Sequence, residues 1–176
     1  MRSGGEDVAV VPEDESLCND LTLEQNILLS SYEKNSRFGG ILNSSELRYL
    51  KNEMISGYIM PKQQIIPDDI IVPEGWFMRK KVSFYKALAS KPKLIVFMNP
   101  TQRIDIISKE EIYEDIRSLK KQGITSLIIS SDIYELISVC ERLLVIQNGK
   151  VQDNMMVNEN AKGLIIKKYG RFLKDL

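Results

Sequence analysis

One uninterrupted apolar run, Leu94 to Met98, most constrains how this chain can fold. Five apolar residues in a row without polar alternation are typical of a strand that is buried on both faces. Asn99-Pro100 follows the run and ends the strand, because proline cannot donate to a sheet ladder. Ligands of open α/β sheets bind outside the carboxyl ends of the strands. We therefore expect the candidate functional side chains near Met98, Asn99 and Thr101.

Strands and helices alternate after this run, which predicts a parallel sheet with right-handed crossovers. Ser108 and Glu111 form a capping-box pattern that predicts a helix start, and Gly123 is placed to end that helix. The further predicted elements are a strand over 125–129, a helix after Asp132, a strand over 143–146, a hairpin turn at 148–149 and a final helix over about 160–173. A short strand over 8–11 precedes them. A lone strand cannot open a parallel sheet, so we expect the chain to be a fragment of something longer.

The first half of the chain has a mostly helical pattern. Thr22 and Gln25 form a capping box that predicts a helix to about Ser31. A second helix is predicted after Ser44 or Ser45, and a third over 79–90. Leu47, Leu50, Met54 and Tyr58 share one face of the second helix. These patterns predict two units: a core lobe formed by residues 1–20 and 90–176, and an inserted helical lobe formed by residues 21–89.

The composition excludes several classes of function. Lys+Arg and Asp+Glu both number 24, so no basic surface for nucleic acid is expected, and Arg79-Lys80-Lys81 is interpreted as a solvated helix face. No apolar run approaches the length of a membrane span, and the first residues lack the pattern of a signal peptide. The chain has no histidine, the commonest general base and metal ligand. Cys18 and Cys140 show no disulfide or metal spacing, which indicates a reduced, cytoplasmic setting.

Several motifs occur in a fixed order along the chain. They are Val11–Asp14 (VPED), Leu23–Asn26 (LEQN), Glu74–Val82 (EGWFMRKKV), Ile95–Asp105 (IVFMNPTQRID), Ile129–Leu136 (ISSDIYEL) and Glu141–Gly149 (ERLLVIQNG). Their order resembles the ATP-binding subunits of ABC importers, above all the second nucleotide-binding half of the two-domain ATPases for ribose, galactose, xylose and nucleosides. The family motifs at these places are VPEDR, an SVxEN-like segment, LSGGNQQKV, ILDEPTRGID, ISSELPEL and DRVLVMxxG. The resemblance implies an α/β P-loop NTPase core with an inserted helical lobe.

The chain departs from this family at the positions that carry its chemistry. The phosphate-binding loop GxxxxGK[ST] occurs nowhere in the sequence, so the core lobe lacks the P-loop unit. Met98 stands where the family has its magnesium aspartate, and a thioether is a poor ligand for a hard cation. Asn99 stands where the family has its catalytic glutamate, and an amide cannot accept a proton at neutral pH. We therefore expect no catalytic residue, no metal site and no cofactor in this chain, although the family uses ATP and magnesium.

Other family positions are altered as well. Gly75, Trp76 and Phe77 stand where the signature has a serine and two glycines that face the phosphates of a nucleotide on the partner domain. Two aromatic side chains there are expected to block close backbone approach. Ser131 occupies the switch position, as in many second halves of this family, and Asp105 keeps its identity in the domain-contact loop. An alternative interpretation is that Asn99, Ser131 and Asp132 are turn and helix caps.

Several functions stay open on these observations. The favoured hypothesis is a degenerate, non-catalytic ABC ATP-binding domain that serves assembly or coupling with an intact ATPase half. It would contact a membrane permease through the helical lobe around Ile27 to Tyr58, and so lie on the inner face of the cell membrane. The alternatives are a repurposed interaction module or remnant with no transport role, and an ATP hydrolase active only with a partner chain.

Overall fold

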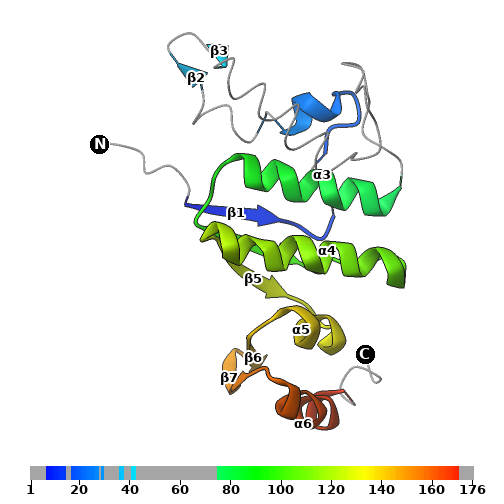
Figure 1. Cartoon of the computed structure of the whole chain (residues 1–176), viewed down its shortest axis with the longest axis vertical. Helices are drawn as coiled ribbons and strands as arrows, with labels where there is room; N and C mark the ends of the chain where they lie inside the picture. Colours follow the sequence, from blue (N-terminus) through cyan, green and yellow to red (C-terminus); the bar gives the residue numbers. More distant parts are fainter. Residues whose placement is uncertain are drawn as a thin grey trace.

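The structure is a computed structural model that describes residues 7–14, 17–27, 29, 36–37, 41–42 and 75–170 (Figure 1). The helix predicted after Ser44 or Ser45, and most of the 21–89 lobe, lie outside the described residues. The described elements are β1 (Val8–Val11), β2 (Ser36–Arg37), β3 (Ile41–Leu42), α3 (Trp76–Ala89), β4 (Leu94–Met98), α4 (Ile106–Ser118), the 3-10 turn η2 (Leu119–Gln122), β5 (Thr125–Ile129), α5 (Ile133–Val139), β6 (Arg142–Gln147), β7 (Lys150–Met156) and α6 (Glu159–Tyr169).

The central sheet has the strand order β1-β4-β5, and both pairs are parallel. The register aligns Val10 with Val96 and Val96 with Leu127. The helix α4 lies between β4 and β5 in the chain, as a parallel crossover requires. The predicted parallel sheet and the strand limits at 94–98 and 125–129 are therefore confirmed.

The core lies on one face of this sheet. Ile95 and Phe97 are 0% and 1% exposed and pack with Val82 of α3 and Ile116 of α4 in one apolar cluster. Figure 1 shows α3 and α4 running beside the strands. Met98, by contrast, is 39% exposed on the other face. The prediction of a strand buried on both faces is wrong, because α3 and α4 cover the same side.

The helix α3 begins earlier than predicted, at Trp76, after Gly75 in an extended conformation. Its lysines Lys80 and Lys81 are each only 3% exposed, so the prediction of a solvated basic face is wrong. The Lys81 ammonium forms ion pairs with Glu111 and, at 3.6 Å, with Asp115, both on α4. Long lysine side chains can bury their aliphatic part when the charged end finds partners.

The helix α4 begins at Ile106, so the predicted start at Ser108 is wrong. Its N-cap is Asp105, whose carboxylate accepts hydrogen bonds from the backbone N–H of Ile107 (3.1 Å) and Ser108 (3.0 Å). Asp105 satisfies the free N–H groups one turn earlier than Ser108 could. The predicted end is confirmed, since Gly123 follows η2 with φ 73° in the left-handed conformation that glycine adopts readily.

The elements from α5 to α6 form a second packing unit. The strands β6 and β7 form an antiparallel hairpin whose turn, Asn148-Gly149, has positive φ at both residues, as predicted for this pair. The hairpin packs on α5 and α6 through a separate apolar cluster that includes Ile137, Leu143 and Ile165. Among the described residues, no helix is long and apolar enough to cross a bilayer.

Candidate functional site at the carboxyl edge of the sheet

The three parallel strands end at one edge of the sheet, and the segments that follow them meet there. Asn99, directly after β4, donates its backbone N–H to the carbonyl of Ile129 at the end of β5 (2.9 Å). Glu13 follows β1, and Ser131 follows β5. The structure thus brings the predicted positions Met98, Asn99 and Ser131 to the same edge, where ligands of α/β sheets bind.

Asn99 is held in an unusual conformation. Its φ is 43°, in the left-handed region that asparagine tolerates better than most residues. Its side-chain amide donates a hydrogen bond to the Glu13 carboxylate, and Lys80 donates to the backbone carbonyl of Glu13. The sequence alone did not predict Glu13 as a neighbour of Asn99. The signal that could have found it is the VPED segment, which ends the strand that pairs with β4.

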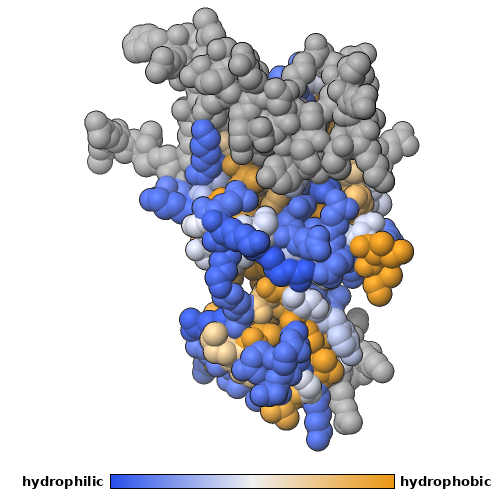
Figure 2. All heavy atoms as spheres, in the orientation of Figure 1, coloured by the Kyte–Doolittle hydropathy of each residue, from blue (hydrophilic) through white to orange (hydrophobic). Residues whose placement is uncertain are grey.

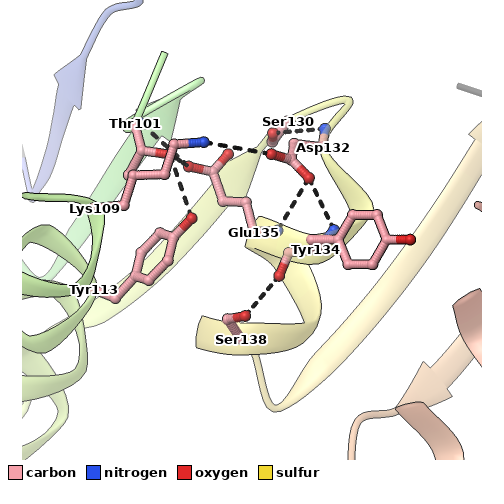
Figure 3. A network of polar contacts seen from close by, with 8 residues as sticks. All are labelled: Thr101, Lys109, Tyr113, Ser130, Asp132, Tyr134, Glu135 and Ser138. Carbon is pink, nitrogen blue, oxygen red and sulfur yellow. Dashed lines mark hydrogen bonds and ion pairs between the residues drawn. The ribbon is translucent and has the colours of Figure 1, made fainter. Parts of the chain in front are cut away.

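A buried polar network fixes the loop after β4 (Figure 3). One carboxylate oxygen of Glu135 accepts hydrogen bonds from the backbone N–H of Thr101 (3.1 Å) and from its hydroxyl (2.6 Å). The Tyr113 hydroxyl lies 3.4 Å from the same threonine oxygen. Thr101 and Glu135 are each 2% exposed. Burial raises the pKa of Tyr113, and the negative charge of Glu135 adds to that effect. The network joins the β4 loop to α5 and α4.

The segment after β5 is organised around Asp132. Its carboxylate accepts hydrogen bonds from the backbone N–H of Tyr134 (2.9 Å) and Glu135 (3.3 Å), so it caps α5. The Lys109 ammonium lies 3.7 Å from the same carboxylate. Ser130 accepts a hydrogen bond from the backbone N–H of Asp132 (3.0 Å), whereas Ser131 is exposed. The interpretation as a cap is confirmed for Asp132, and Ser131 stays a candidate switch position only.

The segment Gly75–Phe77 lies at the start of α3 and contacts the loop after β4. The Arg103 guanidinium lies over the Trp76 ring at 4.5 Å from the centroid, and the Lys81 ammonium lies 5.5 Å from the Phe77 ring. Gly75 is exposed, and Trp76 is 39% exposed. The aromatic side chains therefore occupy the start of this helix and stack on cations of the chain itself.

Asp105 stands between this loop and α4. Its hydrogen bonds with Ser108 and Ile107 lower the pKa of its carboxyl group. The next two residues, Ile106 and Ile107, are each 84% exposed, and an apolar projection stands out at this end of α4 in Figure 2. Asp105 thus caps a helix whose first turn presents apolar side chains to solvent.

Comparison with known proteins identifies homologues. The chain is 33% identical over 155 residues to the ribose import ATP-binding protein RbsA of Caldanaerobacter subterraneus subsp. tengcongensis. It is 32% identical over 155 residues to ribose import ATP-binding protein RbsA 2 of Rhizobium meliloti. These matches cover 88% and 84% of this chain. The chain is a homologue of ABC ATPases. No family model matches it.

The fold of this ABC ATPase homologue agrees with solved structures. A nucleotide-free ATP-binding cassette from an ABC transporter superposes with a TM-score of 0.71 over 94% of this chain, at 17% identity. A dimeric ATP-binding cassette bound to ADP and phosphate gives 0.69 over 87% of this chain, at 20% identity. The predicted α/β fold, a partial P-loop NTPase core, is thereby confirmed. The chain spans 31% and 28% of the length of the two ribose import relatives named above.

The residues of this ABC ATPase homologue fit magnesium and ATP poorly. The side chain at the end of β4 is a thioether, and the next one is an amide bound to Glu13. No group of three or more carboxylate, thiol or imidazole side chains that could hold a metal exists in the part of the chain that the structure describes. No GxxxxGK[ST] loop is present in the sequence to supply a phosphate cradle.

Proposed function

We propose that this chain is a degenerate ABC ATP-binding domain of the sugar or nucleoside importer type, which serves assembly or coupling and does not hydrolyse ATP. The observation that carries the proposal is the pair Met98 and Asn99 at the carboxyl end of β4. Neither side chain can hold magnesium or activate water. The scaffold around them is intact, since Thr101 and Glu135 are buried and hydrogen-bonded.

The proposed partners are an intact ABC ATPase domain and a membrane permease. The exposed Ile106 and Ile107 beside Asp105 support a contact with another ATPase domain, because adjacent exposed apolar side chains mark interaction surfaces. The permease would be bound by the helical lobe around Ile27 to Tyr58, which lies mostly outside the described residues. Such binding would place the chain on the inner face of the cell membrane. Nucleic acid is not a proposed partner, given the net charge of zero.

One observation favours a second candidate, an ATP hydrolase that works only with a partner chain. The Glu13 carboxylate is hydrogen-bonded to the Asn99 amide, so a basic oxygen lies beside the position of the family's glutamate. In that case the partner would have to supply the phosphate cradle and the magnesium ligands. The remaining alternative, a repurposed module or remnant, has no observation of its own.

The test is a calorimetric titration of the purified chain with ATP and magnesium, together with a phosphate-release assay. We expect neither binding heat nor turnover. Turnover by the purified chain that disappears in the Glu13→Gln variant would overturn the proposal in favour of hydrolysis. Recovery of a permease with the chain from solubilised membranes would support coupling, and failure to recover one would favour the repurposed module.

A further inference from the structure

Three segments that are far apart in the sequence are joined at the carboxyl edge of the sheet. They are the turn after β1, the loop after β4 and the first turns of α3. The side chains that join them are those of Glu13, Trp76, Lys80, Asn99 and Arg103. We call these five residues the edge latch.

The contacts of the edge latch form a closed ring. The Asn99 amide donates to the Glu13 carboxylate, which joins the β4 loop to the turn after β1. The Lys80 ammonium donates to the Glu13 carbonyl, which joins that turn to α3. The Arg103 guanidinium closes the ring, since it lies 4.5 Å from the centroid of the Trp76 ring. Each contact limits the motion of the other segments, so the ring acts as a unit.

The backbone of Asn99 is fixed independently of its side chain. Its N–H donates to the Ile129 carbonyl at 2.9 Å, and its carbonyl accepts from the Gln102 N–H at 3.1 Å. The loop also holds two residues other than glycine in the left-handed region, with φ 43° at Asn99 and 63° at Arg103. Such conformations persist where surrounding contacts determine them. The loop therefore presents the amide of Asn99 to Glu13 in a fixed position.

The hydrogen bond between Asn99 and Glu13 is the contact on which the edge latch depends. Both side chains are half-buried, and Lys80 is 3% exposed. Partial burial and an ionised acceptor both strengthen a hydrogen bond. Arg103 is exposed, so its contact contributes less.

Asparagine is the residue type that this bond requires. An ionised carboxylate only accepts hydrogen bonds, so the partner of Glu13 must donate one. An aspartate or glutamate at position 99 would present a second acceptor and repel Glu13. Asn99, which stands where the ABC ATPases have a glutamate, thus lacks a base and supplies a donor.

We propose that the edge latch is a conformational device that holds the start of α3 against the carboxyl edge of the sheet. It consists of the chain's own side chains, so no ligand is required to close it. Asn99 is its essential donor and acts as a positioning residue. Because α3 ends the predicted helical lobe, the edge latch fixes that end of the lobe relative to the core. The inference does not depend on the proposed function, since these contacts form within one chain.

The test exchanges the donor and the acceptor while keeping the shapes of the side chains. Asn99→Asp removes the donor and sets two carboxylates against each other. Adding Glu13→Gln to Asn99→Asp restores one donor and one acceptor. Hydrogen exchange of the backbone amides of residues 79–82 reports on α3, and acrylamide quenching of Trp76, the only tryptophan in the chain, reports on its contact with the β4 loop.

We expect Asn99→Asp to speed exchange at residues 79–82 about tenfold or more and to increase the quenching of Trp76. The double variant should return both signals close to the values of the unaltered chain. Asn99→Gly removes the side chain but accepts the positive φ, so it should loosen α3 as well. The control Asn160→Asp makes the same chemical change at an exposed residue of α6 and should alter neither signal.

Three results would each overturn the inference. They are unchanged exchange in both Asn99 variants, a double variant that exchanges as fast as Asn99→Asp, and an equal change in the Asn160→Asp control. Circular dichroism establishes that each variant is folded before it is scored. If Asn99→Asp does not fold, the comparison of Asn99→Gly with the unaltered chain decides the test.

Discussion

Single buried polar groups hold the loops at the carboxyl edge of the sheet. Thr101 offers both its backbone N–H and its hydroxyl to Glu135, so one side chain of α5 sets the course of the loop after β4. Asn26, which is fully buried, plays a similar part near Cys18, since its amide group bonds both the N–H (2.8 Å) and the carbonyl (2.9 Å) of that residue. These groups have structural partners, so their burial needs no ligand to explain it.

The variant Thr101→Val tests the network around Glu135. It removes the hydroxyl that lies 2.6 Å from the buried carboxylate but keeps the volume of the side chain. We expect a loss of about 1–3 kcal/mol in the free energy of unfolding, because a buried acceptor loses a donor. Urea unfolding at pH 7 measures it. The control Thr125→Val changes an exposed strand residue and should stay within about 0.5 kcal/mol; equal effects would contradict the argument.

The two cysteines should differ in reactivity. Burial, with the Glu135 charge as a smaller cause, raises the pKa of the Cys140 thiol to about 11. At pH 8 only roughly one Cys140 thiol in a thousand is then ionised, and the thiolate is the reactive form. Cys18 is exposed. We expect iodoacetamide at pH 8 to label Cys18 first and Cys140 only slowly, with both labelled in denaturant. Fast labelling of Cys140 in the folded Cys18→Ser variant would refute this.

At the scale of elements, charge pairing joins the two helices that cover the sheet. Lys81 of α3 reaches Glu111 and Asp115 of α4, and burial raises the pKa of Asp115 while Lys81 partly opposes that rise. Phe84 of α3 stacks on Phe97 of β4, with 5.6 Å between ring centroids. The helices therefore meet the sheet through apolar contacts and each other through a buried cation.

The variant Lys81→Met should destabilise the protein at pH 7 by about 2–3 kcal/mol, because Asp115 loses its buried cation while the half-exposed Glu111 can still be solvated. Without Lys81 the pKa of Asp115 rises further above its ordinary value of 3.8. Because the pKa is then higher in the folded than in the unfolded protein, folding becomes less favourable as the pH rises above the unfolded value. The loss of stability in Lys81→Met should therefore shrink towards pH 4. Urea unfolding at both pH values measures it.

The matched control for this variant is Lys120→Met. Lys120 pairs with Glu141, but both side chains are largely exposed. Exposed ion pairs contribute about 0–1 kcal/mol, so the control should change stability little at either pH. An equal effect of Lys81→Met and Lys120→Met would show that the α3–α4 ion pairs do not join the helices as argued.

At the scale of the whole molecule, two features bear on ATP hydrolysis: the residues Met98 and Asn99 after β4, and the absence of a GxxxxGK[ST] loop from the sequence. Replacing Met98→Asp and Asn99→Glu restores the two side chains that the family uses after this strand. We still expect no ATP hydrolysis by the isolated chain, because the sequence has no phosphate-binding loop to hold the nucleotide. A phosphate-release assay measures this, with the two single variants as controls. Turnover by the double variant alone would reveal a phosphate site elsewhere in the chain.

Sequence patterns of local origin predicted much of the fold. The limits of β4 and β5 follow from apolar runs bounded by turn residues, and the ends at Gly123 and Asn148-Gly149 follow from residues that adopt positive φ. The N-cap of α4 was misplaced by three residues, at Ser108 instead of Asp105, because both residue types are good caps and only the backbone decides between them. The candidate positions Met98 and Asn99 follow from their place at the end of an apolar strand, whereas Ser131 follows from the family resemblance.

Long-range contacts could not be predicted from one sequence. The hydrogen bond between Asn99 and Glu13 joins residues 86 positions apart, and the burial of Lys81 depends on Glu111 on another helix. A continuous apolar run indicates that a strand can be buried on both faces. It does not indicate whether helices are present to cover both faces. Local steric and hydrogen-bond preferences thus determined the elements from the sequence alone. Which faces they cover, and which charges they bring together, only the tertiary packing decided.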